Sequence, residues 1–159
     1  MKEINQTHPK STSAYIHIPF CEHICYYCDF NKVFLEGQPV DEYIQSLLTE
    51  IRLTLEKHPT KVSETIYIGG GTPTSLTAKQ LDVLLTGIHR YLPTHTTKEF
   101  TVEANPGDLT AEKLDVLKAH GVNRLSMGHK TFDDCLLTKI GRKHMVQDVY
   151  DTIMLLENQ

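Results

Sequence analysis

The chain has 159 residues, 40% of them hydrophobic, and a formal net charge of -4, which suits one domain with a buried core. The lack of clustered Lys and Arg argues against a nucleic-acid partner or an acidic membrane surface. No apolar run has the length of a membrane span or the form of a signal peptide, so we expect a cytoplasmic protein. In such a reducing compartment, closely spaced cysteines indicate metal ligands or redox groups more often than disulfides.

The first part of the chain predicts a polar leader, one strand and one helix. The leader is expected over residues 1–13, before a core domain over residues 14–159. Alternating apolar residues predict a strand over residues 15–20, and three cysteines follow it directly. A helix is then predicted to begin at Asp41 as its N-cap, because apolar residues recur at helical spacing. Its apolar stripe consists of Ile44, Leu47, Leu48, Ile51 and Leu55.

The middle of the chain predicts a second strand, a glycine loop and a second helix. Residues 65–68 form a short β-rich run that opens into Gly-Gly-Gly-Thr-Pro-Thr at residues 69–74. Thr77 and Gln80 have the spacing of a capping box and predict a helix start. The buried stripe of this helix is expected to consist of Leu81, Leu84, Leu85 and Ile88.

Two further strand and helix units are predicted after residue 99. A third strand is expected over residues 100–105, where Pro106-Gly107 stops it. Thr110 is expected to cap a third helix, which ends at Gly121 in the C′ position. The last predicted elements are a strand over residues 122–128 and helices over residues 131–140 and 146–156.

Alternating strands and helices predict an α/β fold with a parallel sheet and right-handed crossovers. An open doubly wound sheet and a (β/α) barrel both fit this pattern. The barrel is favoured because the cysteines, the glycine loop and the pair Glu103 and Asn105 each stand at the C-terminal end of a strand, where barrel enzymes build their sites. A full barrel takes about 250 residues. We therefore expect a partial TIM-like barrel, truncated at its C-terminus; a complete open four-stranded domain is the alternative.

The cysteines Cys21, Cys25 and Cys28 have C-x3-C-x2-C spacing, whereas Cys135 is distant. Three soft thiolates can hold an iron–sulfur cluster and leave one iron open to a ligand. Zinc is the competing metal, because His23 could complete a Cys3His site. Unliganded thiols are the third alternative. The spacing of His23 is tight for a zinc site and no second Cys or His pair follows, so the cluster is favoured.

The glycine run at residues 69–71 is open to two interpretations. Three glycines before Thr-Pro often form only a tight turn, and the loop lacks the Gly-Lys-Ser/Thr ending of a phosphate-binding loop. Its place after the second strand favours a ligand site, because backbone without side chains can approach a small ligand closely.

Four motifs in this order resemble those of radical S-adenosylmethionine proteins, and among them the oxygen-independent coproporphyrinogen III oxidase-like family. This family includes both the oxidases and haem chaperones. The resemblance covers about residues 14–159. The motifs are Tyr-Ile-His-Ile-Pro-Phe-Cys with the two further cysteines, Gly-Gly-Gly-Thr-Pro-Thr, Val-Glu-Ala-Asn-Pro and Asn-Arg-Leu-Ser-Met-Gly.

The resemblance implies that Cys21, Cys25 and Cys28 ligate a [4Fe–4S] cluster. Its open iron would bind S-adenosylmethionine, which one electron from the cluster would cleave to an adenosyl radical. The implied cofactor contacts are Tyr15 beside the cofactor, Tyr27 on its adenine, Gly70, Gly71 and Thr72 along its methionine part, and Glu103 and Arg142 as anchors. Other roles stay open: the tyrosines as core aromatics, Glu103 as a solvated carboxylate and Arg142 as a surface charge.

Two positions depart from the family pattern. The family commonly has Gly-Val-Gln after the fourth strand, whereas this chain has Gly128-His129-Lys130. A lysine only donates hydrogen bonds, and its charge beside a cationic sulfonium would weaken cofactor binding. Two other roles of Lys130 stay open: a pair with a cofactor carboxylate, and a solvent-facing position in a displaced loop. The oxidases typically have a further cysteine two residues after the third one, whereas here Cys28 is followed by Asp29 and Phe30. Cys-Asp-Phe resembles the haem-chaperone branch.

The resemblance therefore implies a haem chaperone that binds haem and transfers it to client proteins. The haem site is expected beyond Gln159, and a reducing electron donor is an implied partner. The alternative is an oxygen-independent coproporphyrinogen III oxidase, an oxidoreductase that would act on a porphyrinogen, so enzymatic activity stays open. A zinc-stabilised interaction domain is the third hypothesis.

Overall fold

The computed structural model describes residues 12–158 and contains one main sheet of four parallel strands. These are, in spatial order, β1 (Ser13–Ile18), β4 (Thr65–Gly70), β5 (Glu99–Ala104) and β6 (Arg124–Met127). The spatial order follows the chain order without the reversal that defines a doubly wound sheet. The prediction of a barrel-type α/β fold is therefore confirmed over its doubly wound alternative. Of the expected leader, only Thr12 and Ser13 lie within the described residues, and Ser13 already belongs to β1.

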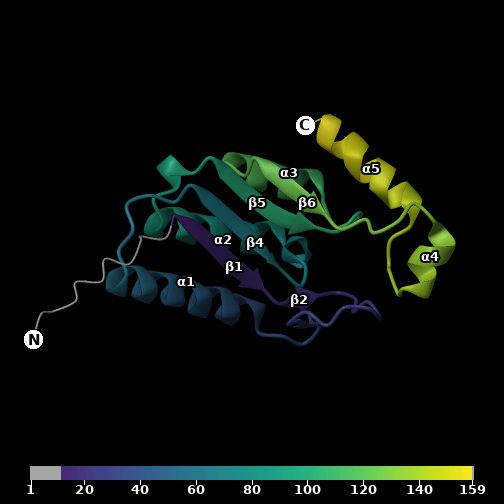
Figure 1. Cartoon of the computed structure of the whole chain (residues 1–159), viewed down its shortest axis with the longest axis horizontal. Helices are drawn as coiled ribbons and strands as arrows, with labels where there is room; N and C mark the ends of the chain where they lie inside the picture. The colour runs from purple at the N-terminus through teal and green to yellow at the C-terminus, as the bar shows by residue number, and fades with distance from the viewer. Residues whose placement is uncertain (1–11, 159) are drawn as a thin grey trace, which may run out of the picture.

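Three helices cover one face of the sheet in the order in which they occur along the chain. Helix α1 (Val40–Lys57) packs against α2 (Ala78–Tyr91), and α2 packs against α3 (Ala111–Ala119). Figure 1 shows α2 behind the strands and α1 below β1, with α4 (Asp134–Lys139) and α5 (Val146–Glu157) beyond one end of the sheet. The short elements are β2 (Phe20–Cys21), β3 (Val33–Phe34) and two single-turn 3₁₀ helices, η1 (Pro73–Ser75) and η2 (Thr94–Thr96).

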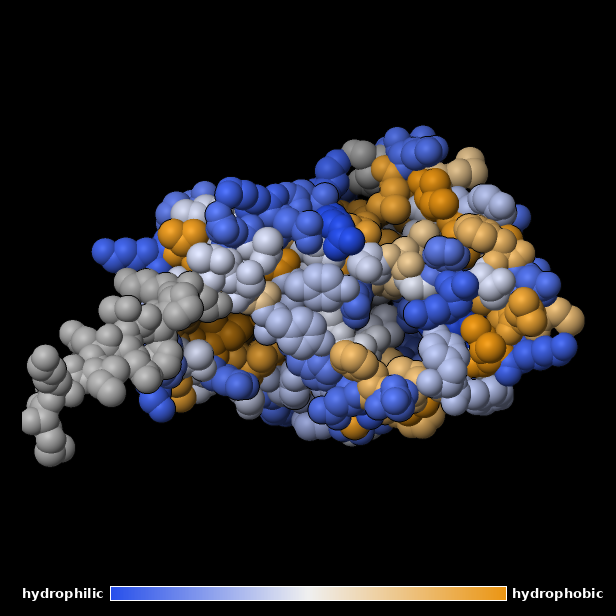
Figure 2. Space-filling model, in the orientation of Figure 1, coloured by the Kyte–Doolittle hydropathy of each residue, from blue (hydrophilic) through white to orange (hydrophobic). Residues whose placement is uncertain are grey.

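The two faces of the sheet differ because side chains alternate along each strand. On the helix-covered face, the strand residues are buried and apolar; they are Ile16, Ile18, Ile66, Ile68, Phe100 and Val102. On the opposite face, which we call the open face, Tyr15 is paired in register with Tyr67 and Tyr67 with Thr101. Tyr15 is 56% exposed. Figure 2 views the molecule in the same orientation, and pale and blue side chains predominate over its middle.

The helix ends follow the capping predictions in two of three helices. Thr77 and Gln80 form the predicted capping box of α2, and Thr110 caps α3, which is followed by Gly121 at a φ of +73°. The prediction of Asp41 as the N-cap of α1 is wrong, since the helix begins at Val40 after Pro39. The Asp41 carboxylate lies in the first turn and accepts a hydrogen bond of 2.8 Å from the Gln80 side chain.

The first strand begins and ends two residues earlier than predicted, and Pro19 explains its end. Proline has no N–H for a sheet hydrogen bond, so β1 ends at Ile18. The chain then forms β2, which pairs in parallel with β3 through Phe20 and Val33. No helix among residues 12–158 is long and apolar enough to cross a membrane.

Candidate cofactor site

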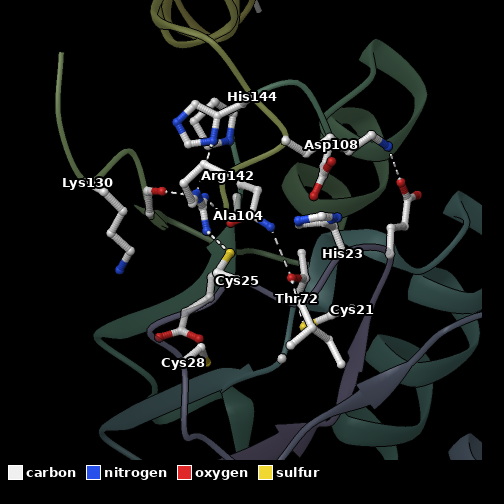
Figure 3. A pocket seen from close by; sticks show the side chains of 18 of the residues that line it. Cys21, His23, Cys25, Cys28, Thr72, Ala104, Asp108, Lys130, Arg142 and His144 are labelled. Atoms are coloured by element: carbon white, nitrogen blue, oxygen red, sulfur yellow. Dashed lines mark hydrogen bonds and ion pairs between the residues drawn. The ribbon is translucent and has the colours of Figure 1, made fainter. Parts of the chain in front are cut away.

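A cavity of about 640 Å³ lies at the C-terminal ends of the strands of the main sheet. It brings together all of the predicted site residues except Tyr15. The predicted residues that line it are Cys21, Cys25, Tyr27, Cys28, Gly70, Gly71, Thr72, Glu103 and Arg142. Figure 3 shows Cys21 beside Thr72, and Arg142 close to Cys25.

The cysteine loop is fixed to the rest of the fold by a few polar contacts. Cys21 belongs to β2 and is buried, whereas Cys25 and Cys28 are half-buried. The Lys32 ammonium donates to the Cys28 carbonyl, and the His17 ring Nε2 donates to the Asn31 carbonyl at 2.9 Å. The loop therefore holds all three thiols at one wall of the cavity.

Two opposing effects act on the pKa of the Cys21 thiol. Burial raises its pKa, because a thiolate is poorly solvated there, while a hydrogen bond with Thr72 lowers it. The two side chains lie 3.6 Å apart, measured from Cys21 Sγ to Thr72 Oγ1. A positive centre such as iron would supply the compensation that a buried thiolate lacks.

The three glycines at residues 69–71 have no room for side chains. A Cβ atom on Gly69 would lie 2.9 Å from Glu103 Oε2, one on Gly70 2.7 Å from the His17 ring, and one on Gly71 2.6 Å from the Pro19 carbonyl. Gly70 also has a φ of +124°. The run therefore closes the end of β4 tightly against β1 and β5, as the turn interpretation expects, while Gly70 and Gly71 also line the cavity.

Arg142 occupies a central position in the cavity wall. Its guanidinium donates to the Gly128 carbonyl at 2.6 Å and to Asn105 Oδ1 at 2.8 Å. It also lies 3.5 Å from both Cys25 Sγ and the Tyr27 hydroxyl. Arg142 is therefore not a free surface charge.

Asn105 was expected at the site end of its strand, but the sequence predicted no contact for it. Its amide nitrogen donates to Thr72 Oγ1 at 3.0 Å, and its oxygen accepts from Arg142. The available signal was a polar residue at a strand end, directly before Pro106-Gly107. Its partners lie 33 and 37 positions away in the chain, a separation that no local pattern reveals.

Glu103 accepts two hydrogen bonds within the protein. The Tyr67 hydroxyl donates to Oε1 at 2.7 Å, and the Gly70 amide donates to Oε2 at 3.0 Å. Tyr15 does not line the cavity but stacks on Tyr67, with ring centroids 6.1 Å apart. Burial and the nearby Glu103 charge raise the pKa of Tyr15. Tyr15 instead lines a second cavity of about 800 Å³ between β1 and α1.

The model of the Radical SAM superfamily matches residues 15–158 of the chain. This chain belongs to the radical SAM superfamily. The resemblance recognised from the motifs is therefore confirmed.

Curated relatives of this radical SAM chain include several proteins named heme chaperone HemW. The chain is 59% identical to the one from Bacillus subtilis and 54% identical to the one from Lactococcus lactis. These matches cover 87% and 93% of the chain but 37% and 38% of the relatives. The chain thus spans a little over one third of the length of these proteins.

Solved structures confirm the radical SAM fold. The coproporphyrinogen III oxidase HemN from Escherichia coli matches with a TM-score of 0.78 and 26% identity, over 92% of this chain and 34% of that one. The radical S-adenosylmethionine methyltransferase TsrM from Kitasatospora setae matches with a TM-score of 0.61 at 18% identity, over 91% of this chain and 28% of that one. The second likeness concerns the fold alone.

Membership of the radical SAM superfamily implies a [4Fe–4S] cluster and S-adenosylmethionine. The donor set fits such a cluster, because three soft sulfur atoms from one loop line a single cavity. His23 lines the same cavity. A site for a single ion such as zinc is a different case: within residues 12–158, no three side chains of His, Cys, Asp or Glu are grouped closely enough to hold one metal ion.

Lys130, the departure from the radical SAM family pattern, lines the cavity next to Tyr27. Its ammonium lies 5.7 Å from the centroid of the Tyr27 ring, a cation–π contact. Lys130 has a φ of +69°, and no other non-glycine residue in the described part of the chain has a positive φ. Left-handed backbone costs a lysine about 1–2 kcal/mol.

His144 holds the loop before Lys130 and is buried in a neutral form. Its Nε2 donates to the His129 carbonyl at 3.1 Å, and its Nδ1 accepts from Arg142 at 3.3 Å. Burial and the neighbouring Arg142 charge lower the pKa of His144. A ring that accepts from a guanidinium at one nitrogen cannot carry protons on both.

Proposed function

We propose that this chain is the radical SAM part of a haem chaperone, which binds haem and transfers it to client proteins. The proposal is supported by its identity of 59% and 54% to proteins named heme chaperone HemW. It is also supported by Cys28-Asp29-Phe30, which has no further cysteine at the position where the oxidases typically carry one. The observation that carries the radical SAM chemistry is the convergence of three thiols and Arg142 on one cavity.

In this proposal the core domain over residues 14–159 acts in the cytoplasm. Cys21, Cys25 and Cys28 hold the [4Fe–4S] cluster, which supplies one electron to S-adenosylmethionine when both are bound. The other proposed cofactor contacts are Tyr27 at the adenine, Gly70, Gly71 and Thr72 along the methionine part, and Glu103 and Arg142 as anchors. Tyr15 supports Glu103 from behind, through its stacking on Tyr67.

Anaerobic reconstitution with iron and sulfide, followed by haem titration, tests the proposal. We expect about four irons per chain with a broad iron–sulfur absorbance, and a haem spectrum that disappears when an apo-haem protein is added. Because the chain spans little more than a third of its relatives, the same titration belongs on the full-length protein. Stoichiometric zinc without the iron–sulfur absorbance would refute the cluster. A full-length protein that binds no haem would refute the chaperone.

A second candidate is oxygen-independent oxidative decarboxylation of coproporphyrinogen III. The structural match to HemN from Escherichia coli, at a TM-score of 0.78, favours it. Incubation of the reduced, reconstituted protein with S-adenosylmethionine and coproporphyrinogen III separates the two functions. We expect no protoporphyrinogen IX, and sustained turnover would replace the chaperone by the oxidase.

A further inference from the structure

A continuous line of polar contacts joins two of the three cysteines across the cavity. From Cys25 Sγ it passes over 3.5 Å to the Arg142 guanidinium, which donates to Asn105 Oδ1 at 2.8 Å. Asn105 Nδ2 donates to Thr72 Oγ1 at 3.0 Å, and Thr72 Oγ1 lies 3.6 Å from Cys21 Sγ. The middle of this line is Asn105, half-buried at the end of β5.

The chemistry of the partners fixes the direction of each hydrogen bond. A guanidinium has donors only, so the oxygen of the Asn105 amide must face Arg142 and its nitrogen must face Thr72. The Thr72 oxygen is thus an acceptor toward Asn105, and its single hydrogen is left for another partner. A cysteine that ligates iron is a thiolate and only accepts. The Thr72 hydroxyl then donates to Cys21 Sγ, which is the acceptor beside it.

We propose that Asn105 is a positioning residue that directs the Thr72 hydroxyl to the Cys21 sulfur and holds Arg142 against the Cys25 sulfur. The inference rests on the proposed function, because it concerns sulfurs that ligate a cluster. Hydrogen bonds to ligand sulfurs withdraw negative charge from an iron–sulfur cluster and favour its reduced form. Asn105 therefore raises the reduction potential of the cluster without touching it.

Asn105→Asp is the sharpest test, because it keeps the shape of the side chain and changes only its hydrogen-bonding character and charge. A carboxylate accepts from Arg142 as the amide does, but it also accepts from Thr72. The Thr72 hydrogen then turns to the introduced carboxylate, and Cys21 loses its donor. In the anaerobically reconstituted protein, titrated with dithionite and mediators, we expect about tenfold less reduced cluster at a fixed potential, read from the paramagnetic signal.

The Asn105→Asp change has two effects: it turns the Thr72 hydroxyl away from Cys21, and it adds a negative charge. A Thr72→Val background separates them, because it has no hydroxyl to turn. Thr72→Val alone should lower the potential, and Thr72→Ser, which keeps the hydroxyl, should restore it. Asn105→Asp should then shift the potential less in the valine background than in the wild type, because only its charge still acts. Equal shifts in both backgrounds, or an unchanged potential in Thr72→Val, would overturn the inference.

The outcomes also distinguish this inference from the proposed function. A protein that assembles no [4Fe–4S] cluster overturns both. A protein that assembles the cluster and transfers haem, but shows no coupling between positions 72 and 105, overturns the inference alone. Asn105→Leu provides a second variant that needs no carboxylate at the site, and it should lower the potential in the same direction.

Discussion

The two faces of the main sheet show how one strand serves two purposes. In β4, Ile66 and Ile68 are fully buried under the helices, whereas Tyr67 between them stands on the open face and donates to Glu103. Ile66 and Ile68 stabilise the fold through the burial of their apolar surface alone. The Tyr67 hydroxyl donates to Glu103 on the next strand, and its ring stacks on Tyr15. Residues one position apart can therefore differ in whether they affect the fold or the site.

The largest effect on the site, without a matching effect on the fold, is expected when one ligand of the cluster is removed. Cys28→Ala should abolish the iron–sulfur absorbance after reconstitution, because two thiols do not hold the cluster. The half-buried Cys28 side chain adds little to the core, so the metal-free protein should unfold within about 0.5 kcal/mol of the wild type. Absorbance and urea unfolding measure the two effects; retention of the full absorbance would contradict the assignment.

The covered face should show the largest effect on stability. Ile68→Ala removes a fully buried side chain from β4 and should lower the free energy of unfolding by about 2–5 kcal/mol. Urea unfolding of the metal-free protein measures it. A loss below about 1 kcal/mol would mean that the neighbouring side chains repack and leave no cavity at this position.

The neighbouring position on the open face provides the matched variant. Tyr67→Phe removes only the hydroxyl that donates to Glu103 at 2.7 Å and should cost about 1 kcal/mol. The same urea measurement applies. A cost equal to that of Ile68→Ala would remove the contrast between the two faces.

At the cavity, the predicted effect is on cofactor affinity. Lys130→Gln removes a cation next to Tyr27 and should strengthen binding of the cationic S-adenosylmethionine about threefold at low salt. Equilibrium dialysis against the reconstituted protein measures the affinity. Lys139→Gln, at an exposed position of α4 outside the cavity, is the control and should change nothing. Weaker binding by Lys130→Gln would assign Lys130 to the cofactor carboxylate instead.

The smallest expected effect is a pH dependence from His144. The pKa of His144 in the folded protein lies below the ordinary value of 6.5. As the pH falls, the His144 ring is therefore protonated in the unfolded chain before it is protonated in the folded protein. The stability contributed by neutral His144 is thus fully present above about pH 6.5 and is lost on acidification toward the lower pKa. His144→Gln should flatten the decline of the unfolding free energy as the pH falls below about 6.5. An unchanged slope would contradict the lowered pKa.

The sequence could predict the elements because their signals are local. The capping box of Thr77 and Gln80 and the apolar stripe of α2 reappear in the structure as predicted. The order of motifs at strand ends also predicted that the cysteines, the glycine loop and Glu103 would meet at one cavity. Parallel strands bring their C-terminal ends to one edge, so the chain order alone determined this meeting.

The remaining features depend on contacts between distant residues. Asp41 lies in the first turn of α1 instead of capping it, and its carboxylate accepts from Gln80 on the next helix, a contact that no local pattern reveals. The two-residue strands β2 and β3 are too short to give a periodic pattern. The bridge from Arg142 through Asn105 to Thr72 joins three loops, and only their packing creates it.

The pairing of β2 with β3 has a consequence for metal insertion. The Val33 amide donates to the Pro19 carbonyl at 2.9 Å, and the Leu35 amide donates to the Cys21 carbonyl at 2.9 Å. These backbone hydrogen bonds join the two ends of the segment that carries the three cysteines without the help of a metal. A loop whose ends are already joined has less conformational entropy to lose when its side chains bind one centre. The β2–β3 pairing should therefore lower the entropic cost of bringing the three thiols onto a cluster.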